Sequence, residues 1–201
     1  MIVLASASPR RHDLLRAAGL DFQVQVAGVD ETLEGDWDPE VAAGELALRK
    51  AKAVAAGRPA GDFVIGADTI VALAIGKATW RLLGKPADAG EARDMLNSLS
   101  GSRHKVITGV AVIPTDGSTP LVEQETTWVT MRRILPLEVE AYVLSEEWRD
   151  KAGGYAIQEN ADVFVTNLEG GGFDNVVGLP VGRTLGLLAR AGACGLPATD
   201  L

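Results

Sequence analysis

Apolar residues along the chain follow two different spacings, and the spacing changes several times from one end to the other. Runs that are continuously apolar, or apolar at every second position, are typical of strands. Apolar residues that recur every three to four positions are typical of helices. The predicted strands cover residues 2–4, 22–26, 63–73, 104–113, 126–132 and 163–165. Residues 76–86 are expected to form a hairpin or a crossover loop with an apolar return at 80–83. The predicted helices cover residues 9–19, 38–57, 88–99, 136–144 and 181–191. Asp38 and Asp88 are the expected N-caps of the second and third of these helices.

Strands and helices in this mixed order predict an α/β or mixed α+β fold with a central mixed sheet. A chain of 201 residues can bury a full core as one domain or as two closely joined lobes. The chain has no internal repeat, low-complexity tract or evident linker. We therefore expect a single domain over residues 1–201.

The loop between the first strand and the first helix is the first candidate site. Ser8 suits the helix N-cap, because its hydroxyl can accept a backbone N–H, and Pro9 suits the first helical position. A helix start gathers N–H groups and the positive end of the helix dipole, and Arg10 and Arg11 add two guanidinium groups. This pattern favours an anion such as phosphate, but an ordinary capped helix with solvated arginines fits it as well.

Asp68 is the sharper signal, because it interrupts the apolar run 63–73. We expect it at a strand break or bulge within Gly66-Ala67-Asp68-Thr69, where an unpaired carboxylate would be costly. A metal ion would satisfy this carboxylate. A turn or a structural ion pair with a lysine would do so equally well.

Four further polar residues gain a role only if they meet Asp68 or a phosphate. Glu31 lies in an acidic loop, where most carboxylates are simply solvated. Together with Asp68, phosphate oxygens and water, it would complete a site for Mg²⁺ or Mn²⁺. Lys50 and Lys85 would either neutralise phosphate or be solvated. Gln158 is either a hydrogen-bonded strand residue or a neutral reader of a base edge.

Charge and motifs exclude several classes of protein. The formal net charge of −8 argues against binding to a nucleic-acid backbone. The sequence contains no GxxxxGK[ST], so it is not a P-loop protein, and no GxGxxG between a strand and a helix, so a dinucleotide-binding fold is unsupported. The single cysteine, Cys194, excludes internal disulfides and thiolate metal clusters. Without a signal peptide or an apolar run of transmembrane length, we expect a soluble cytoplasmic protein with no membrane partner.

Taken together, these segments resemble the Maf family of nucleoside triphosphate pyrophosphatases. The matching motifs run nearly from end to end, and their order and rough spacing are those of the family. They are LASASPRR at 4–11, VDE at 29–31, GADTIV at 66–71, GKP at 84–86, SGSRHKVITGV at 100–110, DKAGGYAIQ at 150–158 and NVVGLP at 175–180.

The resemblance implies an elongated α/β fold shared with inosine triphosphate pyrophosphatases, with a cleft between two lobes and often a homodimer. It implies hydrolysis of a nucleoside triphosphate to monophosphate and pyrophosphate with a divalent metal, Mg²⁺, Mn²⁺ or Co²⁺. Asp68 matches the family's catalytic residue and, with Glu31, its metal ligands. The positions matching phosphate-binding residues are Ser8, Arg10, Arg11, Lys50 and Lys85. The positions associated with substrate choice are Arg11, Thr69 and Gln158.

Within the family, the segments ADT at 67–69 and Tyr-x-x-Gln at 155–158 resemble those of the subgroup that prefers dTTP and UTP, and not those of the subgroup that acts on 7-methyl-GTP. A glutamine amide complements the O4 acceptor and N3–H donor of uracil or thymine. The segment Gly170-Gly171-Gly172-Phe173-Asp174 departs from the usual Gly-Ser-aromatic step, which allows modified nucleotides as further substrates. The alternative functions are a non-catalytic nucleotide-binding regulator of cell division or septum formation and, less in keeping with the charge, a nucleic-acid-binding protein.

Overall fold

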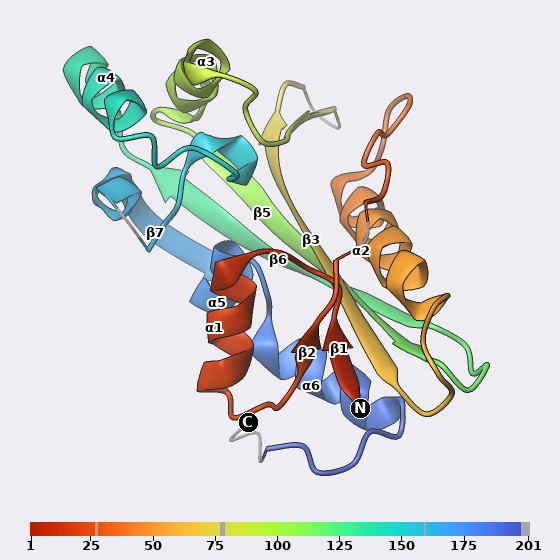
Figure 1. Cartoon of the computed structure of the whole chain (residues 1–201). Helices are drawn as coiled ribbons and strands as arrows, with labels where there is room; N and C mark the ends of the chain where they lie inside the picture. The colour runs from red at the N-terminus through yellow and green to blue at the C-terminus, as the bar shows by residue number, and fades with distance from the viewer. Residues whose placement is uncertain (27, 77–78, 159, 198–201) are drawn as a thin grey trace. The chain divides into compact units, whose positions relative to one another are not determined.

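The computed structural model describes residues 1–26, 28–76, 79–158 and 160–197 (Figure 1). Its strands are β1 (Ile2–Leu4), β2 (Gln23–Val24), β3 (Phe63–Ala74), β4 (Trp80–Leu83), β5 (Arg103–Pro114), β6 (Leu121–Met131) and β7 (Val165–Gly170). Its α-helices are α1 (Pro9–Ala17), α2 (Pro39–Ala55), α3 (Ala89–Leu99), α4 (Pro136–Leu144), α5 (Phe173–Val177) and α6 (Val181–Arg190). Two short 3₁₀ helices are η1 (Ala152–Gly154) and η2 (Asn160–Phe164).

The strands form a mixed sheet in the order β2-β1-β3-β5-β6-β7, with β4 paired to β3 outside this path. Strand β1 pairs in parallel with β2 and β3, whereas β4 and β7 pair antiparallel with β3 and β6. Of the hairpin and the crossover loop left open for the segment that contains β4, the antiparallel pairing of β3 with β4 shows the hairpin. The predicted class, mixed α/β with a central mixed sheet, is confirmed.

The chain divides into two compact units. Unit 1 comprises residues 1–68, 108–125 and 178–201, and unit 2 comprises residues 69–107 and 126–177. Strands β3, β5 and β6 contribute residues to both units. The single domain expected over 1–201 stays a prediction.

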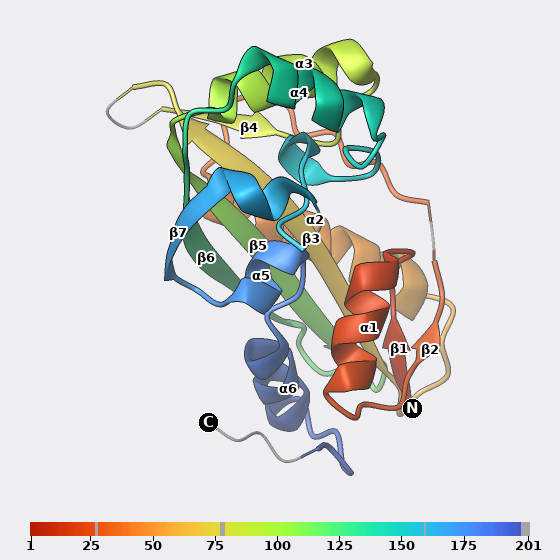
Figure 2. The same cartoon turned by 90° about the vertical axis from the view of Figure 1, so that its left-hand side faces the viewer.

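The strands of unit 1 are covered by helices on both faces. Successive strand residues point to opposite sides of the sheet, so each strand contributes side chains to the core on either face. Helices α1 and α6 lie on one face and α2 on the other (Figures 1 and 2). The first face buries Leu4, Ile65, Val110, Leu15 and Leu188. The second buries Val3, Val64, Ala111, Ala47 and Ala51. The small residues on α2 suit an unusually close approach of this helix to the strands.

Two glycines allow that approach. A Cβ atom on Gly66 would lie 2.2 Å from the carbonyl oxygen of Ala47, and one on Gly109 would lie 2.2 Å from that of Ala43. Neither position has room for any side chain. Gly66 therefore marks a helix contact and not a break, and the break or bulge expected around Asp68 is wrong, since β3 runs unbroken from Phe63 to Ala74.

The sequence placed two edge strands poorly. The strand predicted at 22–26 is reduced to Gln23–Val24, and both residues are exposed. The strand predicted at 163–165 instead covers 165–170, where most side chains are exposed and polar, while Phe164 at the end of η2 enters the core. A solvated edge strand has little apolar pattern to reveal it. Helix α5 was not predicted.

Unit 2 has its own core, in which α3 and α4 pack side by side (Figure 2). The imidazole of His104, whose exposed fraction is 0%, is buried beside this core. Its Nε2 lies 2.9 Å from the Tyr155 hydroxyl, and its Nδ1 lies 3.1 Å from Oγ of Ser102. Burial lowers the pKa of His104 from 6.5 to about 4, so the ring is neutral at pH 7.

We expect Gly109→Ala to lower the free energy of unfolding by at least about 2 kcal/mol, because the new methyl group overlaps the α2 backbone. Gly186→Ala is the matched control, since Gly186 is exposed within α6 with open space around its Cβ position. The control should gain about 0.5–1 kcal/mol from helix propensity. Urea unfolding measures both, and equal effects would contradict the close packing of α2.

His104 should make the protein sensitive to acid. Its pKa is lower in the folded than in the unfolded state, so the unfolded state binds more protons between pH 6.5 and 4. Stability should therefore fall as the pH drops through this range, by about 3 kcal/mol from this residue. Urea unfolding at several pH values tests it. The His104→Gln protein should lose that part of the pH dependence, and an unchanged slope would contradict the assignment.

Candidate active site

Three of the predicted site residues meet in unit 1. Asp68 lies on β3, Lys50 on α2 and Glu31 in the segment between β2 and α2. The ammonium nitrogen of Lys50 lies 2.5 Å from Oδ1 of Asp68 and 3.0 Å from Oε1 of Glu31. One lysine thus bridges two carboxylates that are 37 positions apart in the chain.

The packing of α2 explains this meeting. Asp68 follows Gly66 by two positions and therefore points to the same face of β3, the face that α2 covers. Lys50 precedes Ala51, whose backbone would contact a Cβ on Gly66. Only 12% of the Lys50 side chain and 10% of the Asp68 side chain are exposed. The ion pair that the sequence left open for Asp68 is therefore present and largely buried.

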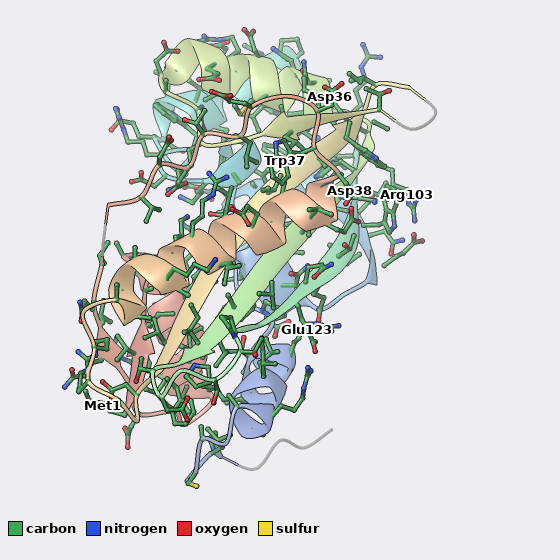
Figure 3. The ribbon with its side chains drawn as sticks, turned by 90° about the vertical axis from the view of Figure 1, so that its right-hand side faces the viewer. Met1, Asp36, Trp37, Asp38, Arg103 and Glu123 are labelled. Carbon is green, nitrogen blue, oxygen red and sulfur yellow. The ribbon has the colours of Figure 1, made fainter. Side chains whose placement is uncertain are left out.

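Helix α2 is itself fixed at its start. Asp38 stands at its N-cap and accepts the backbone N–H groups of Glu40 and Val41, each at 3.1 Å (Figure 3). Pro39 occupies the first helical position. This is the cap predicted from the sequence, and it fixes the point at which α2 begins.

Arg11 joins the same charged group. Its Nε donates to the carbonyl oxygen of Gly178 at 2.7 Å, and its Nη1 donates to Oγ of Ser6 at 3.1 Å. Burial lowers the pKa of the Arg11 guanidinium, and the negative charges of Asp68 and Glu31 oppose that shift. Arg11 is thus close enough to both carboxylates to interact with them electrostatically.

The loop before α1 differs in detail from the prediction. Ser8 is the N-cap residue and Pro9 follows it, as expected, but the Ser8 hydroxyl makes no capping hydrogen bond. Instead, the backbone N–H of Ser8 donates to Oγ of Ser6 at 3.3 Å. The half-buried Arg10 follows in the first turn, and its positive charge further lowers the pKa of Arg11.

Ser6 organises this loop, and the sequence did not single it out. Its buried hydroxyl accepts from both Ser8 and Arg11, and its carbonyl oxygen lies 2.8 Å from Nε2 of His12. The only signal in the sequence is the spacing of two serines before Pro9. A hydroxyl that ties a loop to a guanidinium group holds that group's direction as well as its position.

The other three predicted residues belong to unit 2. Thr69 directly follows Asp68 on β3 and is half-buried. Lys85 and Gln158 are exposed, and Gln158 lies in a turn, so the strand alternative for it is wrong. The backbone N–H of Gly153 donates to the carbonyl oxygen of Gly84 at 2.9 Å. The segments that carry Lys85 and Gln158 are therefore tied together within unit 2.

The two carboxylates suit a cation. The Lys50 ammonium shows that one positive group can contact Glu31 and Asp68 at the same time. Among the described residues, no group of three or more His, Cys, Asp or Glu side chains is placed to hold a metal ion. A hard divalent cation held here would take its remaining oxygen ligands from phosphate and water.

A family profile described as "Maf-like protein" matches residues 1–191. The chain belongs to the Maf family. The resemblance carried by the sequence motifs is confirmed. Proteins named dTTP/UTP pyrophosphatase from Pelotomaculum thermopropionicum and Koribacter versatilis are each 46% identical to it over 95% of this chain, and 96% and 94% of their own lengths are covered. The protein of that name from Caulobacter vibrioides is 47% identical, with 95% of each chain covered.

Two solved structures are similar to this Maf protein at a much lower level. The Ham1 protein of Staphylococcus aureus has 18% identity and a TM-score of 0.45, covering 65% of this chain and 71% of its own. A nucleoside-triphosphatase (dITP/XTP pyrophosphatase) of Mycobacterium abscessus has 16% identity and a TM-score of 0.40, covering 66% of this chain and 74% of its own.

Among the described residues, no helix combines the length and apolar character needed to span a membrane.

We expect Lys50→Met to lower the free energy of unfolding at pH 7 by about 3 kcal/mol, because Asp68 is left buried without its closest cation. Asp68→Asn in the Lys50→Met background should recover at least half of that loss, since a neutral amide carries no uncompensated charge. Lys52→Met, at an exposed position of α2, should change stability by less than about 0.5 kcal/mol. Urea unfolding of these three variants and of Asp68→Asn alone provides the test, and additive effects of the two site substitutions would contradict the coupling.

Proposed function

We propose that this Maf protein hydrolyses dTTP and UTP, and by extension modified nucleotides, to the monophosphate and pyrophosphate. One observation carries the proposal: Lys50 bridges the carboxylates of Glu31 and Asp68. This arrangement occurs in a chain whose relatives at 46–47% identity are named for that activity. Because this hydrolysis removes nucleoside triphosphates, modified ones included, we propose a house-cleaning role in which the protein clears unwanted triphosphates from the nucleotide pool.

Different residues are proposed to bind the phosphate groups and to activate the attacking water. Attack by water on a phosphorus atom of the anhydride requires neutralised oxygens and a water held in line. We assign the phosphate oxygens to the loop before α1 and to the lysines. These residues are Ser8, Arg10, Arg11, Lys50 and Lys85. Asp68 is assigned the water, whose proton its carboxylate would accept as the new P–O bond forms and pyrophosphate leaves.

Glu31 and Asp68 are the residues that would hold a divalent cation, for which we propose Mg²⁺, Mn²⁺ or Co²⁺. Such a cation supplies positive charge to the phosphates and lowers the pKa of water. The Lys50 ammonium contacts the same two carboxylates, so it would move toward a phosphate oxygen when they ligate a cation. Its flexible side chain permits this exchange of partners.

Base choice is assigned to Gln158, with Thr69 and Arg11 as further contributors. A glutamine amide offers one donor and one acceptor, which match O4 and N3–H of uracil or thymine. Cytosine presents the opposite polarity at N3 and at the 4-position, so it would pair only with the reversed orientation of the amide. Gln158 is exposed in its turn, so its amide is accessible to a base.

We also propose a cytoplasmic homodimer that acts on free nucleotides. The formal net charge of −8 supports the absence of a nucleic-acid partner. Light scattering of the purified protein tests the dimer.

We expect Asp68→Asn to lower kcat for pyrophosphate release from UTP by about a hundredfold or more, because the amide keeps the shape but cannot accept the proton. Assays contain Mg²⁺, Mn²⁺ or Co²⁺ in turn. Asp36→Asn, at an exposed position, should retain full turnover.

An Asp68→Asn protein that is folded and keeps most of its turnover would show that Asp68 is not the catalytic residue. Wild-type protein that binds UTP but releases no pyrophosphate with any of the three metals would instead support the nucleotide-binding regulator. Asp68 would then have only a structural role in the Lys50 ion pair.

A further inference from the structure

The hydrogen bond between His104 and Tyr155 has no part in the chemistry described above. Both side chains are buried, with exposed fractions of 0% and 6%. Their rings meet edge to face, with centroids 5.8 Å apart and planes at 84°. Two apolar side chains would fill the same space without the cost of burying polar atoms. What a directional bond adds is a single defined position for the residue it holds.

Tyr155 directly follows η1, a short 3₁₀ helix that is tightly fixed in unit 2. Gly153 and Gly154 have φ values of 69° and 71°, a left-handed conformation that favours glycine. A Cβ on Gly153 would lie 2.9 Å from Cγ2 of Val71, and its N–H donates to Gly84. The 3₁₀ helix therefore packs against β3 and is bonded to the residue that precedes Lys85.

Gln158 lies between two anchored points of the same segment. Before it, Tyr155 bonds His104, and the backbone N–H of Ala156 donates to the Tyr142 hydroxyl at 3.3 Å. After it, the backbone N–H of Asn160 donates to a carboxylate oxygen of Glu147 at 3.1 Å. Tyr155, Ala156 and Ile157 are buried, and Gln158 is exposed. The direction in which Gln158 leaves the core is thus set by the residues just before it.

We propose that His104 and Tyr155 are positioning residues, whose buried hydrogen bond fixes the segment 151–158 so that Gln158 presents its amide to the base. This inference rests on the proposed function. The bond contributes to discrimination between uracil and cytosine through Gln158. Both rings are neutral near pH 7, because burial lowers the pKa of His104 and raises the pKa of Tyr155. The anchor is therefore the same across the neutral pH range.

The test is Tyr155→Phe, which removes one hydroxyl and keeps the ring. Values of kcat and KM are measured for UTP and CTP. A misplacement of about 1 Å can cost as much as about a hundredfold in rate. We expect the ratio of kcat/KM for UTP over CTP to fall about tenfold, mainly through a higher KM for UTP.

Two further variants separate positioning from stability. Val139→Ala removes buried volume from the same core at a residue of α4, so it lowers thermal stability without touching the hydrogen bond. It should leave the UTP over CTP ratio unchanged. Gln158→Ala should lower the ratio, and adding Tyr155→Phe to it should then have no further effect.

The outcomes are distinct. A fall in the ratio for Tyr155→Phe that disappears in the Gln158→Ala background supports the inference. An unchanged ratio in Tyr155→Phe, or a fall of the same size in Val139→Ala, overturns it, as does a fall that persists without Gln158. Wild-type protein that releases no pyrophosphate from UTP would overturn the proposed function itself. His104→Phe, which removes the partner group, should reproduce the ratio of Tyr155→Phe if it folds.

Discussion

The close contact between α2 and the strands of unit 1 is the constraint on which the charged group depends. Gly66 and Gly109 leave no space for a Cβ atom, so the α2 backbone can lie against β3 and β5. Because the helix lies this close, the ammonium of Lys50 reaches Asp68 directly. A helix held a few ångströms farther away by larger residues would leave Asp68 buried and unpaired, which is costly. In unit 1, the close packing of α2 is therefore also the condition under which Lys50 can neutralise Asp68.

The ion pair has two roles that pull in different directions. As a structural element, Lys50 compensates the buried charge of Asp68. In the proposed reaction, the same carboxylate must face water and a divalent cation, so Lys50 has to leave it. The second partner, Glu31, is almost half exposed at its side chain, and Arg11 supplies another positive charge nearby. A cluster that contains more than one positive group can exchange one cation for another without exposing a bare charge.

Motifs and helix boundaries were predictable from the sequence, whereas contacts between distant segments were not. The caps at Asp38 and Asp88 were correct, because a cap depends on residues within one turn. The role of Gly66 was misread, since it depends on Ala47 and Ala51 of helix α2, which lie 19 and 15 positions earlier in the chain. Ser6 was missed because it acts through Arg11, and a serine in a loop carries no distinctive pattern. Edge strand β7 was displaced because its solvated side chains lack alternation.

The two units fix their candidate site residues by different physical means. In unit 1, the position of Lys50 follows from steric fit, because backbone atoms of α2 meet glycines on the strands. In unit 2, Gln158 stands in a turn, where no regular ladder of hydrogen bonds holds the chain. A turn needs separate tethers, and the hydroxyls of Tyr155 and Tyr142 supply them from inside the core. A reader of a base edge must be placed by direction as well as by distance, since its donor and acceptor differ. Buried hydrogen bonds impose direction, which steric packing alone does not.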